Sequence, residues 1–147
     1  MFVSKLNPAG TALIYSTFLG GVADSHALGL DIDSTGSAYV AGYTSAGDFP
    51  VTAGAFQTLC GGNYSAASGT RVRVNGCAVS ADTSGFLTKL SPAGNSLEYS
   101  TFLGGSGFSQ ITGVAVDAAG EAYVTGDTNS QCGAGPYCCL LYTSRCV

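Results

Sequence analysis

One internal repeat constrains this chain more than any other feature. Residues 2–44 align without a gap on residues 86–128, and 23 of the 43 aligned pairs are identical. The densest match is LIYSTFLGG at 13–21 against LEYSTFLGG at 97–105. Two copies of one sequence are expected to form two copies of one structural unit, and such units bury their apolar faces by stacking on each other. The chain must therefore adopt a fold that repeats.

Each copy reads as four short strands joined by turns. In Asn7-Pro8-Ala9-Gly10, the Pro at the second position and the Gly at the fourth suit a type I turn. In Asp33-Ser34-Thr35-Gly36, the Asp33 carboxylate is expected to cap the turn by accepting hydrogen bonds from backbone N–H groups. We expect antiparallel strands and no long helix, with strands at 2–6, 12–19, 27–33, 37–44 and the positions 84 residues later. Four strands per unit with Gly-rich turns are typical of a β-propeller blade.

The repeat also resembles the SBBP repeat of bacterial β-propellers. The resemblance covers residues 1–57 and 86–128 and rests on four motifs in family order, FVSKLNPAG, LIYSTFLGG, DIDSTGSAYVAGYTS and GDFPVTAGAFQ. It implies a large extracellular or cell-surface protein, and it implies no defined reaction.

The phase of the repeat predicts an all-β partial β-propeller. If the LDID strand is innermost, one full four-stranded blade (22–105) lies between an outer half-blade (1–21) and an inner half-blade (106–128), followed by a loop (129–138). A propeller needs about four blades or more to close. We therefore expect a fragment whose partners are the remaining blades of the same propeller, and which is unstable, oligomeric or aggregation-prone alone.

An insertion, 58–85, interrupts the first copy. Alternation around Asn75-Gly76 predicts a hairpin over Val72–Val79. Of the six cysteines, Cys60 and Cys77 are favoured as a disulfide that closes the insertion, with Cys132–Cys138 a weaker pair. The alternative is that all cysteines are reduced. No Cys-x-x-Cys occurs, so no zinc site is expected.

Composition limits the partners. Charged residues make up only 10% of the chain, and the net charge is −4. Five scattered basic residues cannot form the basic surface that nucleic acid requires. No apolar window is long enough to span a membrane, and residues 1–10 do not have the pattern of a signal peptide.

The candidates for catalysis are weak. His26 has Gln110 as its repeat partner and is expected to be an exposed loop histidine, and no serine lies in a nucleophile elbow. Asp31-x-Asp33 superficially suggests a calcium loop, but further oxygen ligands are missing and Asp31 becomes Ala115 in the second copy. Asp31 is therefore interpreted as incidental. We expect no catalytic, cofactor-binding or metal-binding residue.

Other recurring residues suggest a structural role. Lys5 and Lys89 are interpreted as strand-edge lysines that protect an edge from pairing. Tyr15, Phe18 and Tyr39 recur and are expected to pack between neighbouring blades rather than to form a sugar-stacking platform.

Two functions remain open. The first is a non-catalytic extracellular scaffold or interaction module for adhesion, glycan or protein binding, with the insertion as its binding surface. The alternative is a fragment of a propeller enzyme, such as a polysaccharide hydrolase or lyase. That enzyme would need acidic groups at the channel mouth, and only Asp24 and Asp31 fit this loosely.

The last nine residues, CLLYTSRCV at 139–147, fit no blade. They can be written as TGT CTC TTA TAC ACA TCT AGA TGT GTA. That DNA resembles a transposon mosaic end from sequencing libraries joined to its own reverse complement, and the next codon of the junction is a stop. We therefore predict that this segment is not native protein. The alternative is a natural apolar tail with a short strand at Leu140–Tyr142.

Overall fold

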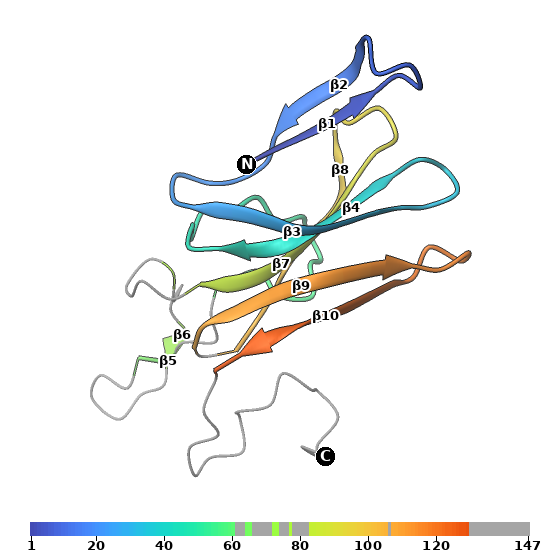
Figure 1. Cartoon of the computed structure of the whole chain (residues 1–147). Helices are drawn as coiled ribbons and strands as arrows, with labels where there is room; N and C mark the ends of the chain where they lie inside the picture. The colour runs from blue at the N-terminus through green and yellow to red at the C-terminus, as the bar shows by residue number, and fades with distance from the viewer. Residues whose placement is uncertain (61–63, 66–71, 74–76, 78–82, 106, 130–147) are drawn as a thin grey trace.

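The computed structural model describes residues 1–60, 64–65, 72–73, 77, 83–105 and 107–129 (Figure 1). The regular elements of these residues are all strands, as expected. The proposed non-native segment 139–147, the cysteines at 132 and 138, and most of the predicted loop 129–138 lie outside the described residues. No helix within the described part of the chain is long and apolar enough to cross a membrane.

The repeat forms eight strands close to the predicted positions. In both copies, the strands form where side chains alternate between the two faces of the sheet. Several strands are followed by a turn that contains a glycine with a positive φ, such as Gly10 and Gly36. The strands are β1 Phe2–Leu6, β2 Leu13–Phe18, β3 Ser25–Ile32, β4 Ala38–Thr44, β7 Ser84–Leu90, β8 Leu97–Leu103, β9 Ser109–Val116 and β10 Ala122–Thr128.

One four-stranded antiparallel sheet, in the order β3-β4-β7-β8, is the complete blade. β4 and β7 pair from Ala38↔Leu90 to Thr44↔Ser84 although the insertion separates them in sequence. β1-β2 and β9-β10 form two-stranded sheets with the registers of their repeat partners, since Phe2↔Phe18 corresponds to Phe86↔Phe102. The predicted full blade between two half-blades is confirmed.

The complete blade lies between the two half-blades, and its two faces bury different side chains (Figure 1). On one face, Val3 and Leu19 of the first half-blade share a cluster with residues that include Val40, Phe86, Leu90 and Phe102. Phe49, from the segment after β4, closes this cluster with its ring 4.5 Å from that of Phe86. On the opposite face, the second half-blade contributes residues to another cluster, which contains Ala41, Leu87, Ile111, Val114 and Val124.

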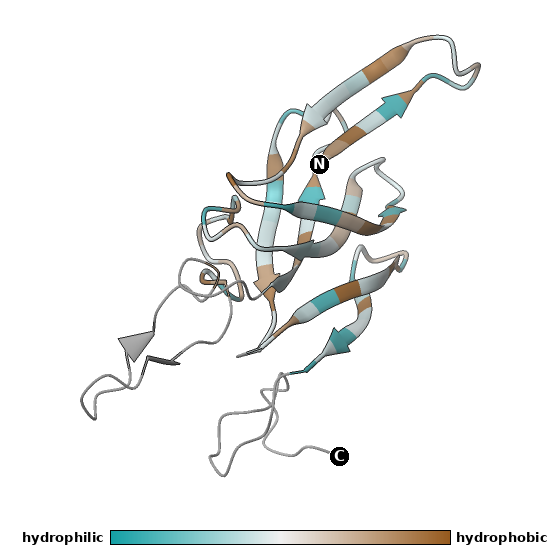
Figure 2. Ribbon diagram, turned by 60° about the vertical axis from the view of Figure 1, so that its left-hand side comes forward, coloured by the Kyte–Doolittle hydropathy of each residue, from teal (hydrophilic) through white to brown (hydrophobic). Residues whose placement is uncertain are grey.

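The first half-blade exposes residues that the complete blade buries. Phe2 is 69% exposed and Phe18 is 90% exposed, whereas their repeat partners Phe86 and Phe102 are 0% exposed. Figure 2 shows hydrophobic residues on both strands of this half-blade. The innermost strand β3 also has exposed apolar residues, namely Leu28, Leu30 and Ile32. These are the faces on which further blades of a propeller pack.

The insertion contains a short two-stranded ribbon. β5 (Tyr64–Ser65) pairs antiparallel with β6 (Val72–Arg73), so the partner of β6 precedes it in the chain. The prediction had paired Val72–Arg73 with the residues that follow Asn75-Gly76, and those two turn residues lie outside the described residues. Residues 74–76, 78 and 79 of the predicted hairpin lie outside the described residues, so the hairpin over Val72–Val79 stays a prediction.

Cys60 and Cys77 meet at the base of the insertion. Their Cα atoms lie 5.6 Å apart and their sulfur atoms are joined. Cys60 is fully buried in the cluster around Val40. This separation is within the range of a disulfide, so the two cysteines favoured by the sequence are able to form one.

Candidate functional site

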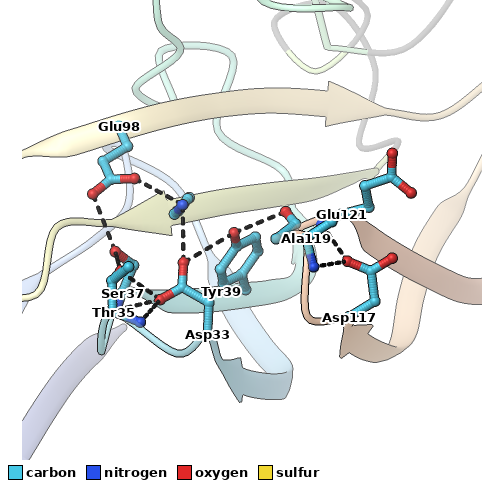
Figure 3. A network of polar contacts seen from close by, with 10 residues as sticks. Asp33, Thr35, Ser37, Tyr39, Glu98, Asp117, Ala119 and Glu121 are labelled. Carbon is cyan, nitrogen blue, oxygen red and sulfur yellow. Dashed lines mark hydrogen bonds and ion pairs between the residues drawn. The ribbon is translucent and has the colours of Figure 1, made fainter.

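The most highly organised polar group of the blade begins in the turn between β3 and β4. One oxygen of Asp33 accepts hydrogen bonds from the N–H groups of Thr35 and Ser37, at 2.9 and 3.0 Å, and from the Thr35 hydroxyl at 2.6 Å. In the second copy, Asp117 accepts the two corresponding hydrogen bonds from the N–H groups of Ala119 and Glu121 (Figure 3). The prediction that Asp33 caps its turn is confirmed.

Lys89 reaches this turn from β7. Its Nζ lies 3.0 Å from Asp33 Oδ2 and 2.9 Å from Glu98 Oε2, and its side chain is only 16% exposed. The prediction that Lys89 is an edge lysine was wrong. β7 is a central strand, between β4 and β8, so the side chain extends over the sheet to an ion-pair partner rather than protecting an edge.

Glu98 completes the ion cluster and was missed by the sequence analysis. Its Oε1 accepts a hydrogen bond of 3.1 Å from the Ser37 hydroxyl, so Glu98 joins β8 to the capped turn. The first copy has Ile14 at this position. The sequence did contain a signal, the change from Ile14 in the first copy to Glu98 in the second. A carboxylate that replaces an apolar residue near a lysine present in both copies predicts an ion pair.

The contacts favour the charged forms of Asp33 and Lys89. The hydrogen bond from the Thr35 hydroxyl is the main cause of a pKa of Asp33 far below its usual range, and Lys89 and the turn N–H groups add to it against the opposing effect of burial. The Tyr39 hydroxyl and Glu98 raise the pKa of Lys89. Shifts of the pKa in these directions, away from neutral pH, suit a structural role of Asp33 and Lys89 better than proton transfer, which needs a pKa near the working pH.

Tyr39 connects the cluster to the next half-blade. Its hydroxyl donates to the Gly120 carbonyl at 3.0 Å and lies 3.3 Å from Asp33 Oδ2. Its ring is fully buried, 5.0 Å beneath the Lys89 ammonium. Tyr39 therefore packs between neighbouring blades, as predicted.

Asp31 forms a second connection between blades. Its Oδ2 accepts a hydrogen bond of 2.7 Å from the Val116 N–H of β9, and its Oδ1 accepts one from Ile32. The interpretation of Asp31 as incidental was wrong, because the N–H group it binds lies in the next repeat and is not visible in the local sequence. Within the described residues no group of three or more metal-binding side chains occurs.

The candidate residues near the other end of the blade do not assemble around His26. His26 is exposed but lies in strand β3 rather than in a loop, and its ring stacks on Tyr43 at 4.8 Å. Asp24 accepts a hydrogen bond from the Ser45 N–H through its main-chain carbonyl, and Asp48 accepts one from the Val22 N–H through its carboxylate. These contacts hold the segment before β3 against the segment after β4.

A four-stranded blade stacked between two half-blades by these contacts defines a β-propeller repeat protein. Residues 98–131, which span β8 to β10, match the family model of the SBBP β-propeller repeat. The chain thus contains an SBBP-type β-propeller repeat. The curated proteins contain no match to it.

Proposed function

We propose that this chain is a non-catalytic scaffold and interaction module of an extracellular or cell-surface β-propeller. The observation that carries the proposal is the use of its acidic groups. Asp33 and Asp117 cap turns, Asp31 joins two blades and Glu98 neutralises Lys89, so these carboxylates serve the framework.

The insertion is the proposed binding surface. It departs from the repeat, it leaves the blade between two central strands, and the Cys60–Cys77 pair holds its base against the core. A rigid scaffold that presents a variable loop is the usual way in which a propeller binds a partner. A disulfide at this position also supports an oxidising, extracellular compartment.

A glycan array tests the binding function. The wild-type chain is compared with a variant in which residues 61–82 are replaced by a short Gly-Ser linker, which keeps β4 and β7. The matched control is Asn7→Ser, which gives the first turn the residue of its repeat partner Ser91. The proposal predicts glycan binding that is lost only in the linker variant. Binding that survives this replacement would contradict it.

Two further variants, Asp24→Asn and Asp31→Asn, test the enzyme alternative. Cleavage of a polysaccharide panel by the wild-type chain that Asp24→Asn or Asp31→Asn abolishes, while the fold is retained, would overturn the non-catalytic proposal. We expect no cleavage that depends on these two residues.

A further inference from the structure

The outer edge of the complete blade is covered by a segment that is not a strand. β8 is the last strand in the order β3-β4-β7-β8, and among the described residues it pairs only with β7. Along its other side, β8 receives hydrogen bonds from residues 49–60, which follow β4 and precede the insertion. We call residues 49–60 the edge strap.

The edge strap satisfies the outward-facing backbone groups of β8. The Ser100 N–H donates to Thr52 Oγ1 at 3.0 Å, and the Ser100 carbonyl accepts from the Thr52 N–H at 3.1 Å. The Phe102 N–H donates to the Gln57 carbonyl at 3.0 Å. The Gly104 N–H donates to Gln57 Oε1 at 3.2 Å. Three alternate N–H groups are therefore occupied, and these are the groups with which an edge strand recruits another strand.

The edge strap ends the sheet rather than extending it. Between its two contact points it turns back, with the Ala55 N–H donating to the Thr52 carbonyl at 3.1 Å and Gly54 at a φ of 79°. A segment that turns in this way does not present a straight row of backbone groups to a further strand. The edge strap thus protects the blade from pairing through β8.

Both ends of the edge strap are anchored. At the start, the buried Phe49 ring lies 4.5 Å from the Phe86 ring in the core of the blade. At the end, Cys60 is fully buried in the same cluster and is joined to Cys77, with the Cα atoms 5.6 Å apart. Cys77 Sγ lies 3.7 Å from the carbonyl oxygen of Thr44, the last residue of β4. The disulfide therefore fixes the end of the edge strap beside the strand from which the strap departs.

We propose that the disulfide between Cys60 and Cys77 holds the edge strap on β8, and that a thiol reductant opens this edge. A dithiol reductant gives its two thiol hydrogens and two electrons to the protein. The S–S bond breaks, Cys60 and Cys77 become thiols, and the reductant becomes a disulfide. The end of the edge strap is then held by noncovalent contacts alone, so its local opening costs less free energy. The edge opens without a ligand, so this redox control does not rest on the proposed binding function.

Amide hydrogen exchange measured by nuclear magnetic resonance on the whole chain tests the proposal. Adding dithiothreitol should make exchange about tenfold faster or more at Ser100, Phe102 and Gly104, whose N–H groups bind the edge strap. The N–H groups of Thr101 and Leu103 alternate with these and point toward β7, so their exchange should change much less. Equal acceleration on the two sides of β8 would indicate general destabilisation and would overturn the proposal. Unchanged exchange at the amides bound to the strap would also overturn it.

Cysteine variants assign the effect to one disulfide. Cys60→Ala with Cys77→Ala should show the fast exchange without reductant and no response to dithiothreitol. The matched control keeps this pair and replaces the other four cysteines by Ser, namely Cys132, Cys138, Cys139 and Cys146. It should respond as the wild-type chain does. A response that persists in the double Ala variant, or that disappears in the control, would contradict the assignment. If the double Ala variant does not fold, the wild-type chain and the control decide the matter.

Discussion

The hydroxyl of Tyr39 donates a hydrogen bond to the main-chain carbonyl of Gly120, 81 residues further along the chain. This contact joins the second strand of the complete blade to the turn of the next half-blade. It does so beside the ion cluster of Asp33, Lys89 and Glu98, so one region orders both the blade and its neighbour. The predictions below test this framework.

Tyr39→Phe should lower the free energy of unfolding by about 1 kcal/mol, because it removes the hydrogen bond between the buried Tyr39 side chain and the Gly120 carbonyl. The matched control is Tyr43→Phe, whose ring stacks on His26 and stays in place in the variant. Urea unfolding at one fixed protein concentration measures both changes. An equal loss in the two variants would argue against the contact between blades.

Gly94→Ala should be markedly more destabilising than Gly54→Ala. Both glycines have a positive φ, 68° and 79°, so both variants acquire backbone strain of about 1–2 kcal/mol. A Cβ at Gly94 would also overlap the Tyr15 ring of the preceding half-blade, whereas a Cβ at Gly54 meets nothing within 4 Å. Overpacking of this kind adds about 1–3 kcal/mol. Equal melting temperatures for the two variants would contradict the packing of the first half-blade on the blade.

The stability of the chain should fall steeply in acid. The pKa of Asp33 is lowered in the folded state, first by the Thr35 hydroxyl, so its stabilising contribution is complete above the unfolded pKa of about 4. It is lost as the pH falls from there toward the folded pKa. Asp33→Asn should therefore be less stable at neutral pH and show a flatter decline in acid. Asp24→Asn, at an exposed position, should keep the steep wild-type profile in the same pH series of urea unfolding.

Cys60 and Cys77 should be recovered as one linked pair. Trypsin cleaves after Arg71 and Arg73, between the two cysteines, so only a disulfide can hold their peptides together. Mass spectrometry without reductant should show this linked species, and reduction should separate it. A loop of this size predicts a loss of about 2–4 kcal/mol in the double Cys→Ser variant. Two free peptides from protein purified under oxidising conditions would contradict the bond.

Local sequence predicted most of the fold. The alternation of side chains in a strand and a turn glycine such as Gly36 are both visible within a few residues of sequence. Because the two copies of the repeat must form the same strands, the sequence predicted the strands and the division into blades. The bounds were less certain, since β3 begins at Ser25 rather than at residue 27. Pairing within the insertion depends on more distant partners: β6 pairs with β5, which precedes it in the chain, and no local signal identified β5 as a strand.

The polar network was predictable only where it is local. Asp33 caps a turn two to four residues away, and this was expected. Asp33, a partner of Lys89, lies 56 residues away in sequence, in the turn between β3 and β4. Val116, the partner of Asp31, lies 85 residues away, in the next repeat. Only the closed sheet and the stacking of blades bring these groups together, which is why the two side chains were misinterpreted.

The central claim is that β4 and β7, which the insertion separates in sequence, close one blade between the two half-blades. Cross-strand nuclear Overhauser effects test it most directly. We predict backbone contacts between Val40 and Thr88 and between Gly42 and Phe86, in the register of the complete blade, together with a contact between the Tyr39 ring and Gly120. Contacts of β7 with a strand other than β4 or β8, or no contact of Tyr39 with the turn at Gly120, would contradict the account.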